Sequence, residues 1–299
     1  MEVALLGYGY WGKIVETYIH SNKFMDLKKI YVRNKPRDQG DIFTSDLDDI
    51  MTDDEIEAVF VCLPASMHFD ICKIALEKGK HIFCEKPLVK FGQDHSRLEE
   101  LAGTVQRILY TDYIYTASPS IARMKENLSA LGDIYLIEGQ LFQFGKFYQG
   151  DSIWENIGIH LISVLCDWFP TINIKKIERY SQANGNVECV SLEDEQGMQV
   201  KLECSLLCPC KKRCIYVYGQ MGSMCFDMLD PDATVRMNLF DANKNGVQLS
   251  NASSWKYDEG NNLEFSIQRF TDFIKAGNYA SNLQLSRQTN ALIHRILRT

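Results

Sequence analysis

The sequence predicts an α/β protein that joins a doubly wound parallel sheet to an α+β domain with a larger, mostly antiparallel or mixed sheet. Three observations predict this class. Short apolar runs alternate with amphipathic helical patterns in the first third of the chain, and a glycine-rich turn follows the first run. After about residue 115, strand patterns follow one another with few helices between them. Because strand–helix–strand repeats build parallel sheets, we expect two domains, 1–115 and 116–299.

The composition excludes several classes of protein. The 299 residues carry a net charge of −7, whereas nucleic-acid-binding proteins usually present a basic face. No apolar run approaches the roughly 18 residues of a membrane span. The apolar run after Met1 stops at Gly7, too early for a signal peptide. We therefore expect a cytoplasmic protein whose ten cysteines are free thiols.

The first domain is expected to begin with a buried strand. Val3–Leu6 is a continuous apolar run that ends in glycine, which is typical of a strand covered on both faces. An amphipathic helix is expected at 14–19, and Pro64 closes the clearest strand pattern, 58–63. The other expected elements of this domain are strands at 30–32, 81–84 and 108–110 and a helix over 71–76 that ends at Gly79.

The second domain is expected to be rich in strands. Ser118 and Pro119 are suited to cap and start a helix, and Gly132 is suited to end it. Further expected elements are strands at 134–142, 198–207 and 214–218, a turn at 243–246, and closing helices at 263–276 and 283–297.

Gly7, Gly9 and Gly12 form a G-x-G-x-x-G turn between the first strand and the first helix. In this context the first glycine makes the tight turn, the second lets the backbone approach a pyrophosphate, and the third lets the helix pack against the sheet. The amides of the helix N-terminus then face the phosphates. A glycine corner without a ligand is the competing interpretation. All three glycines lie in register at the start of an alternating domain, which favours dinucleotide binding.

The end of the second strand favours NADP over NAD. An acidic residue about 20 residues past the glycines would bind the ribose hydroxyls of NAD. That position holds Arg33, Asn34 and Lys35. A cation at this place can pair with the 2′-phosphate of NADP. A solvated basic loop is the alternative, and NAD therefore stays open.

A later segment resembles a known family. Residues 75–87 read ALEKGKHIFCEKP, and the ending Glu85-Lys86-Pro87 is similar to the Gfo/Idh/MocA family, the relatives of glucose–fructose oxidoreductase and inositol dehydrogenase. Residues 132–134, GDI, resemble the family's turn before its C-terminal sheet. The likeness extends over nearly the whole chain. The segment from 113 to 160 is most similar to the nucleotide-sugar dehydrogenase branch.

The resemblance implies a Rossmann domain that binds NAD or NADP and a second domain whose open sheet flanks the active site. It also implies a homodimer or homotetramer formed through that C-terminal sheet. For the aromatic residues of the glycine turn packing is the alternative, and for His68 a structural role is favoured. The residues expected to bind the cofactor are Gly7, Tyr8, Gly9, Tyr10, Trp11, Gly12, Arg33, Asn34, Leu63, Pro64, His68, Glu85 and Lys86.

The resemblance assigns the chemistry to Lys86 and His160. Hydride transfer at an alcohol carbon requires that the oxygen gain or lose a proton and that its developing charge be held. The family counterpart of Lys86 hydrogen-bonds the substrate oxygen, and a lysine desolvated there would have a lowered pKa. His160 is the candidate acid/base. A surface lysine and a satisfied core histidine are the alternatives.

Asn156 departs from the family pattern. The family commonly shows Asp-x-x-x-His, with both side chains on one helix face at i and i+4. This chain has Asn156 four residues before His160. Asparagine cannot take a proton, although it can hydrogen-bond a sugar hydroxyl. We therefore expect His160 to transfer the proton alone or with Lys86, and Tyr113 and Tyr115 to edge the substrate cleft.

Cys204, Cys208, Cys210 and Cys214 crowd one strand region. Their spacing differs from the paired CxxC knuckles of usual zinc sites. The first three share one parity, so on an unbroken strand they would share one face. We expect buried thiols and no metal, with a metal site as the minor alternative.

The sequence thus predicts an NAD(P)-dependent dehydrogenase or reductase that acts on a sugar, cyclitol or nucleotide-sugar alcohol or ketone. A reductase of another small carbonyl or imine would have the same cofactor half. A catalytically silent NAD(P)-binding sensor is the alternative from a different class. Asn156 favours the sensor, and the retention of Lys86 and His160 opposes it.

Overall fold

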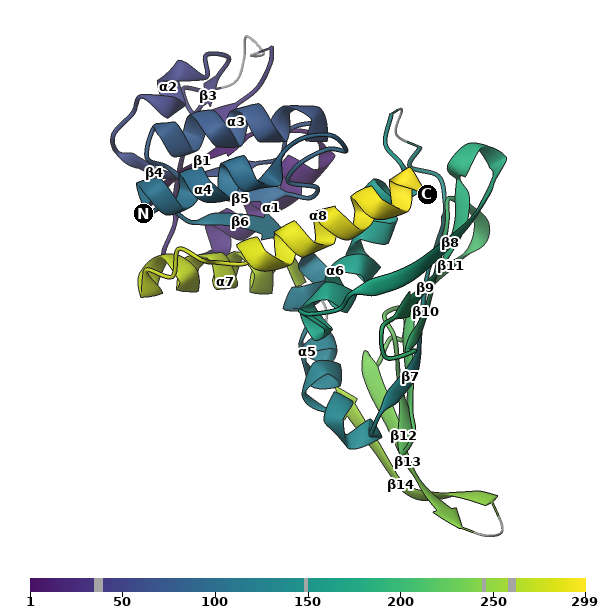
Figure 1. Cartoon of the computed structure of the whole chain (residues 1–299). Coiled ribbons are helices and arrows are strands. Elements are labelled where there is room, and N and C mark those ends of the chain that lie inside the picture. The colour runs from purple at the N-terminus through teal and green to yellow at the C-terminus, as the bar shows by residue number, and fades with distance from the viewer. Residues whose placement is uncertain (35–39, 148–149, 244–245, 258–261) are drawn as a thin grey trace. The chain divides into compact units, whose positions relative to one another are not determined.

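A computed structural model describes residues 1–34, 40–147, 150–243, 246–257 and 262–299. The chain divides into two compact units, whose elements are labelled in Figure 1. Unit 1 comprises Met1–Ile114 and Asn262–Asn290, and unit 2 comprises Tyr115–Asn261 and Ala291–Thr299.

This division differs from the expected 1–115 and 116–299 at the C-terminal end. The sequence patterns assign 262–290 to the second domain, whereas this segment packs in unit 1. The reason is the apolar face of α7 (Asn262–Ala276), because Leu263 and Phe270 are buried in the core under the first sheet. The last helix, α8 (Leu283–Arg298), begins in unit 1 and ends in unit 2.

The sheet of unit 1 is parallel throughout and has the strand order β3-β2-β1-β4-β5-β6. This order is that of the doubly wound dinucleotide-binding fold, as the alternating pattern predicts. The central strands β1 and β4 are almost entirely buried, because helices cover both faces. The strands are β1 (Glu2–Leu6), β2 (Asp26–Tyr31), β3 (Phe43–Thr44), β4 (Ile56–Val61), β5 (His81–Glu85) and β6 (Leu109–Asp112).

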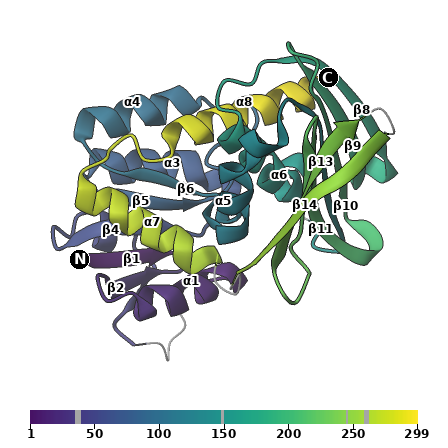
Figure 2. The same ribbon diagram turned by 90° about the horizontal axis from the view of Figure 1, so that it is seen from below.

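Helices pack on the two faces of this sheet in two separate cores. One core includes Ile71 of α3 and Leu98 of α4, and the other includes Val15 of α1 and Phe270 of α7. Figure 2, seen from below, shows α7 in front of the sheet. The helices of the N-terminal segment are α1 (Tyr10–Ser21), α2 (Asp48–Met51), α3 (Ala65–Glu77) and α4 (His95–Val105).

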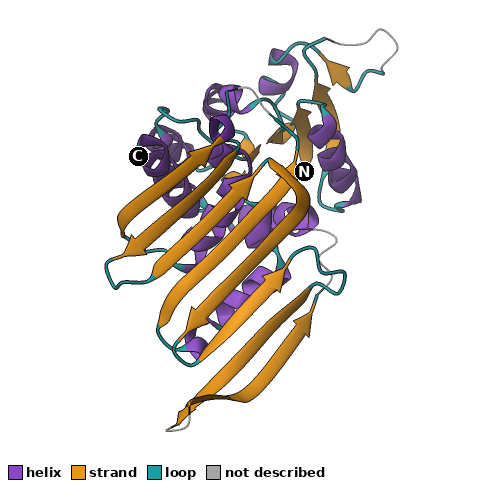
Figure 3. Ribbon diagram, turned by 90° about the vertical axis from the view of Figure 1, so that its right-hand side faces the viewer, coloured by secondary structure: helices purple, strands orange, loops and turns teal. Residues whose placement is uncertain are grey.

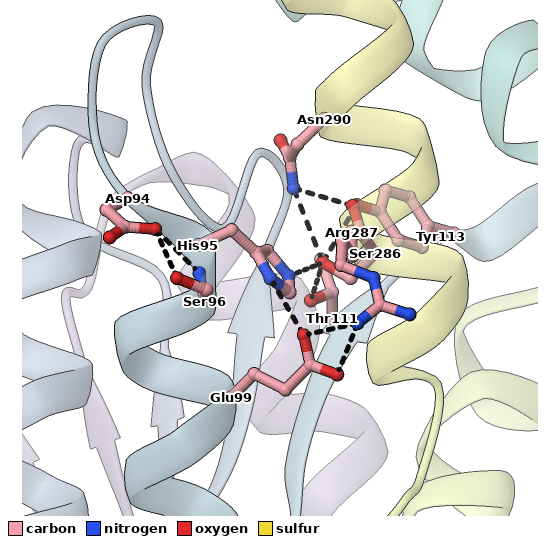
Figure 4. A network of polar contacts seen from close by, with 9 residues as sticks. All are labelled: Asp94, His95, Ser96, Glu99, Thr111, Tyr113, Ser286, Arg287 and Asn290. Carbon is pink, nitrogen blue, oxygen red and sulfur yellow. Dashed lines mark hydrogen bonds and ion pairs between the residues drawn. The ribbon is translucent and has the colours of Figure 1, made fainter.

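A buried polar network ties α4 and α8 to the end of β6 (Figure 4). Ser286 Oγ lies 3.0 Å from His95 Nε2 and 3.1 Å from Thr111 Oγ1, and the Tyr113 hydroxyl donates to it over 3.3 Å. Glu99 approaches the other ring nitrogen of His95 at 3.7 Å. Ser286 is fully buried, so this serine–histidine–glutamate arrangement fixes a helix rather than exposing a nucleophile.

The sheet of unit 2 has eight strands in the order β14-β13-β12-β11-β7-β10-β9-β8. Only the β7–β10 pair is parallel among the described pairings, which confirms the expected mixed, mostly antiparallel sheet. Its strands are β7 (Ile134–Phe144), β8 (Ile174–Gln182), β9 (Val187–Asp194), β10 (Gln199–Ser205), β11 (Leu207–Gly219), β12 (Gly222–Asp227), β13 (Thr234–Asn243) and β14 (Gly246–Lys256).

Two α-helices of unit 2 pack on one face of this sheet. Ser118 caps α5 (Pro119–Glu126) by accepting a hydrogen bond from the Ile121 N–H, and Pro119 starts the helix, as predicted. Helix α6 (Ile159–Trp168) approaches β7 at Gly139, where an added Cβ would lie 3.0 Å from Leu161. The opposite face of the sheet is turned to the viewer in Figure 3, and no described helix lies on it.

Some elements were not expected from the sequence. The patterns do not indicate α4, the short strand β3 or the short helix α2, and a helix at α6 is expected only from the family pattern around His160. At the tip of the β13–β14 hairpin, Asn243 pairs with Gly246, and residues 244–245 of the expected turn lie outside the described residues. Over the part of the chain that the structure describes, no helix has the length and apolar character needed to cross a membrane.

The expected strand at 198–207 is wrong in one respect, because it breaks at Leu206. The N–H of Leu206 donates to the Asn186 carbonyl, and the chain then enters β11 on the far side of β7. Cys204 is therefore buried on β10, whereas Cys210 lies exposed on β11, so the cysteines do not share a buried face. No cluster of His, Cys, Asp and Glu within the described ranges has the geometry of a metal site.

Candidate functional site

The glycine turn, residues 7–12, is shaped by two close backbone contacts. Gly7 has φ +100°, and a Cβ added there would lie 2.6 Å from the carbonyl oxygen of Cys62. A Cβ at Gly12 would collide with the Gly7 carbonyl. Gly9 differs, since a Cβ there would meet nothing within 4 Å. Gly7 and Gly12 therefore pack tightly, Gly7 against the residue that follows β4 and Gly12 against Gly7. The backbone at Gly9 leaves space for a ligand to approach.

The helix that follows the turn has no side-chain cap at its N-terminus. Gly9 is the N-cap of α1 and supplies no side-chain cap, and the first turn of the helix has no acidic residue. The first N–H groups of a helix lack partners within the helix, and its dipole favours an anion at this end. The open backbone at Gly9 and these amides fit the pyrophosphate of a dinucleotide.

The aromatic residues of the turn have three different environments. The Tyr8 hydroxyl donates to Glu16 over 2.7 Å, and its ring packs edge-on against Phe43, so Tyr8 holds the turn to α1 and β3. Tyr10 is 74% exposed. The Trp11 indole N–H donates to the Glu85 carboxylate, which links the turn directly to the end of β5.

Two loops at the same edge of the sheet are held by His68. The Nε2 atom of His68 lies 2.8 Å from the carbonyl oxygen of Leu63, and Nδ1 lies 2.7 Å from that of Pro87. His68 is 1% exposed. It therefore joins the loop after β4 to the loop that carries Lys86, which is the structural role that the sequence favours. The Lys86–Pro87 peptide bond is cis.

Arg33 and Asn34 follow β2 and are both exposed. Lys35, on which the NADP preference also depends, lies outside the described residues. No acidic side chain occupies positions 33 and 34, where an NAD-specific site would place one.

Two acidic groups, the half-buried Glu85 and the buried Asp112, lie close to Lys86. Glu85 ends β5, Asp112 ends β6, and the two are opposite each other in the parallel pairing. Burial raises the pKa of both carboxyls, and the charge of Glu85 raises the pKa of Asp112 further. Asp112 was not identified from the sequence. The signal was available, because the carboxyl ends of adjacent parallel strands meet at one edge.

In unit 2 the predicted acid/base lies in what we call the His160 cluster: His160, Tyr115 and Arg213. The rings of Tyr115 and His160 are stacked, with centroids 4.7 Å apart and planes 26° apart. Burial raises the pKa of the Tyr115 hydroxyl, while its hydrogen bond with Arg213 opposes that shift. Arg213 also donates to Gln143 over 3.4 Å. The sequence gives no signal for Arg213, because the register of β11 against β7 places it here.

A π-helical turn, Trp154–Gly158, precedes His160 where an ordinary helical turn was expected. The Trp154 ring packs against Gly158, at which a Cβ would collide with it. The Trp154 indole N–H donates to the buried Glu188 carboxylate of β9 over 2.6 Å. Turns of this kind are frequent at functional sites. The wider turn alters the i, i+4 relation on which the expected common face of Asn156 and His160 depends.

The remaining predicted substrate residues, Asn156 and Tyr113, have other hydrogen-bond partners. The Asn156 amide donates to the Lys146 carbonyl over 3.3 Å. Tyr113 belongs to unit 1, is fully buried, and donates to Ser286. Its place inside the network of Figure 4 is incompatible with the expected position at the edge of a cleft. Lys86 belongs to unit 1 and His160 to unit 2.

Comparison with known proteins identifies the cofactor half. Residues 1–113 match the family model GFO_IDH_MocA, described as an oxidoreductase family with an NAD-binding Rossmann fold. Levoglucosan dehydrogenase of Pseudarthrobacter phenanthrenivorans is 30% identical over 136 residues, which are 40% of this chain and 35% of that protein. The matched region thus spans about a third of that relative's length.

Solved structures resemble the chain over nearly its whole length. UDP-N-acetylglucosamine 3-dehydrogenase GnnA from Acidithiobacillus ferrooxidans has a TM-score of 0.82 at 17% identity, covering 98% of this chain and 95% of that chain. The 3-ketoreductase KijD10 from Actinomadura kijaniata, in complex with NADP and TDP-benzene, has a TM-score of 0.80 at 16% identity, covering 97% and 94%. At such identity the likeness shows the fold.

The match agrees with the resemblance carried by the Glu85-Lys86-Pro87 segment. Over residues 1–113 the chain matches the model of the Gfo/Idh/MocA oxidoreductases with their NAD-binding Rossmann fold.

Proposed function

We propose that this protein transfers a hydride between a nicotinamide cofactor and the alcohol or ketone carbon of a sugar-like substrate. The observation that carries the proposal is the glycine turn, with open backbone at Gly9, linked through Trp11 and Glu85 to the segment of Lys86. Bound NAD(P) supplies the acceptor or donor of the hydride. The turn and the α1 amides hold its pyrophosphate, and both NAD and NADP fit.

The protein's own groups move and hold the proton. When an alcohol is oxidised, its carbon loses a hydride and its oxygen loses a proton. Lys86 holds that oxygen and stabilises its developing charge, and His160 accepts the proton. In the reverse reduction His160 returns the proton. The stacked Tyr115 restricts the orientation of the His160 ring. The Asn156 side chain has the donor and acceptor groups that a hydrogen bond to a substrate hydroxyl requires.

The substrate class within this proposal is a sugar, cyclitol or nucleotide sugar. Three similar proteins support this substrate class. GnnA is named as a UDP-N-acetylglucosamine 3-dehydrogenase, the relative from Pseudarthrobacter as a levoglucosan dehydrogenase, and KijD10 as a 3-ketoreductase in complex with TDP-benzene. NADP is the favoured cofactor, because Arg33 stands exposed where a 2′-phosphate would lie and no acid replaces it. A reductase of another small carbonyl or imine would use the same cofactor half.

A silent NAD(P)-binding sensor is the second candidate function. Its support is Asn156, which cannot take a proton at the position where the family commonly has aspartate. The sensor would bind cofactor without turnover of any sugar. Retention of Lys86 and His160 favours the enzyme.

Assembly through the second sheet and a cytoplasmic location remain predictions of this proposal. Tyr180 and Phe144 alternate onto the sheet face opposite α6 and are 63% and 72% exposed. Exposed aromatic side chains are enriched where subunits meet. A homodimer or homotetramer formed through this face would cover them.

A combined binding and activity screen tests the proposal. Thermal-shift measurements with NAD(H) and NADP(H), alone and with sugars or nucleotide sugars, identify ligands, and the nicotinamide absorbance then follows turnover. We expect stabilisation by both cofactors, a lower Michaelis constant for NADP(H), and turnover of at least one sugar-like compound. Cofactor binding without turnover on the whole panel would favour the sensor, and absence of cofactor binding would refute both candidates.

A further inference from the structure

The carboxyl groups of Glu85 and Asp112 interact directly, since the charge of Glu85 raises the pKa of Asp112. They end neighbouring parallel strands and face each other in the strand register. Asp112 is 1% exposed. Carboxylate oxygens only accept hydrogen bonds, so a bond between two carboxyl groups requires a proton on one of them. A hydrogen bond between the two carboxyl groups would therefore hold one proton in the folded protein.

The remaining contacts show which carboxyl carries that proton. Glu85 accepts hydrogen bonds from the Trp11 indole and from the backbone N–H of Lys86. Asp112 accepts at Oδ1 from the Ser266 hydroxyl over 2.6 Å. Its Oδ2 atom is buried and meets no donor among the described residues. A proton on Oδ2 that is donated to Glu85 gives every atom of the pair a partner, whereas a proton on Glu85 would compete with its two donors.

The hydrogen-bond chain behind Asp112 has a fixed direction. The Ser266 hydroxyl has one hydrogen, and it donates that hydrogen to Asp112. The Tyr110 hydroxyl, 3.0 Å from Ser266 Oγ, must therefore be the donor in that contact. The chain runs from Tyr110 through Ser266 and Asp112 to Glu85, so the negative charge resides on Glu85, beside Lys86.

The charged and titratable groups around the pair agree with a single negative charge. Cys62 of β4 is held neutral, because burial raises its pKa and both carboxyl groups raise it further. The charge of Lys86 acts on both carboxyls and lowers their pKa values. Arg269 of α7 acts on Tyr110, whose pKa is raised by burial. Two carboxylates in contact, one of them fully buried, cannot both ionise without a large cost.

We propose that Asp112 is a positioning residue that stays protonated and donates to Glu85. It thereby holds Glu85 as the anionic acceptor of the Trp11 indole and the Lys86 peptide. The inference rests on the proposed function, since it assigns to the pair the placement of the Lys86 side chain for hydride transfer. The single charge on Glu85 balances the Lys86 ammonium, and the three donors fix the glycine turn and the Lys86 segment relative to each other.

Two substitutions at Asp112 test whether this side chain acts as a neutral hydrogen-bond donor or as an anionic carboxylate. Asp112→Asn keeps a donor for Glu85 and an acceptor for Ser266, whereas Asp112→Leu keeps the approximate size and removes both. We expect kcat to fall about 10- to 100-fold in Asp112→Leu and to recover to within about threefold of wild type in Asp112→Asn. Cofactor KM changes less than kcat in both. An asparagine variant as impaired as the leucine variant would overturn the proposal.

Asp272→Asn is the matched control. Asp272 lies exposed on α7, so its substitution replaces an aspartate carboxyl without touching the pair. We expect wild-type kcat and an unchanged pH profile for this variant. A loss in Asp272→Asn equal to that in Asp112→Leu would assign the effect to net charge and refute the positioning role.

Two measurements test the retained proton without relying on activity or on the folding of the leucine variant. Above about pH 7 ordinary carboxyls are ionised, so the infrared C=O stretch of a carboxylic acid should appear in wild type and vanish in Asp112→Asn. Absence of that band from wild type would overturn the proposal. If no sugar is turned over, the proposed function fails while this test still decides the protonation of the pair.

The second measurement is the pH dependence of stability. A carboxyl whose pKa is raised on folding stabilises the protein fully below its unfolded value of about 4 and loses that contribution as the pH rises toward the folded value. The urea midpoint of wild type should therefore fall relative to that of Asp112→Asn between about pH 5 and pH 8. A constant difference between the two proteins would contradict a retained proton.

Discussion

The glycine turn of unit 1 and the His160 cluster of unit 2 are built in opposite ways. The turn occupies residues 7–12, and its shape comes from backbone contacts with Cys62 and within the turn itself. The His160 cluster gathers side chains from positions 115, 160 and 213, and Glu188 supports the helical turn before it. A local site depends on a few glycines, whereas a dispersed site depends on strand register. Substitutions in the turn should therefore change the affinity for the cofactor, and substitutions in the His160 cluster should change kcat.

The largest expected effect is on turnover in Lys86→Ala and His160→Ala. Each should lower kcat by about 10²- to 10⁴-fold, because each removes a group that holds or moves the proton. The Kd of NADPH, measured by fluorescence titration, should stay within about threefold of wild type. Lys73→Ala, which removes a half-buried lysine that is paired with Glu77 on α3, is the control. Wild-type turnover in either variant would refute the assigned role.

Gly12→Ala should act on the cofactor rather than on the chemistry. The added Cβ would collide with the Gly7 carbonyl, so the turn must open and the α1 amides must shift. We expect cofactor Kd to rise about 100-fold, which corresponds to about 2.7 kcal/mol, and the Tm to fall. Gly103→Ala is the matched control, since a Cβ there meets nothing within 4 Å and the helix should gain about 0.5–1 kcal/mol. Unchanged cofactor affinity in Gly12→Ala would contradict this account of the turn.

Trp154→Phe should disturb the His160 cluster while leaving the glycine turn intact. The substitution removes the indole donor and leaves the Glu188 carboxylate buried, with Arg179 at 3.8 Å as its ion-pair partner among the described residues. The loss of a buried hydrogen bond to a charged group costs about 1–3 kcal/mol of stability. We expect kcat to fall about 10-fold with cofactor Kd unchanged. In Trp255→Phe, which removes an indole from β14, both quantities should stay at wild-type values.

The smallest expected effect is a change in the pH dependence of stability in His81→Asn. The His81 Nδ1 atom accepts a hydrogen bond from the Ile108 N–H, and burial, with the nearby Arg107 charge, lowers its pKa to about 4. A pKa lowered on folding stabilises the protein above the unfolded value of about 6.5 and loses that contribution as the pH falls toward 4. Urea unfolding of His81→Asn should therefore vary less over this range than that of wild type. Equal slopes would refute the assigned pKa, and the exposed His20→Asn serves as control.

Much of unit 1 could be predicted from its sequence, because its determinants are close together in the chain. Apolar runs such as Val3–Leu6 require burial on both faces, and the alternation with helices then requires a parallel sheet. The helix α4 was not predicted, because its buried face has few apolar residues, such as Leu98 and Ala102. The packing of α7 on unit 1 was not predicted either. An amphipathic pattern shows that one face of a helix is buried, but it does not show against which core that face packs.

The sequence by itself determined the parallel sheet, the G-x-G-x-x-G turn and the Glu85-Lys86-Pro87 segment, because these follow from periodicity and short-range spacing. Only the tertiary structure decided the partners of each side chain. The break at Leu206 moved β11 to the far side of β7, which placed Arg213 beside Tyr115 and separated the cysteines. The pairing of β5 with β6 brought Glu85 and Asp112 together. Strand register joins residues distant in sequence, and no local pattern specifies it.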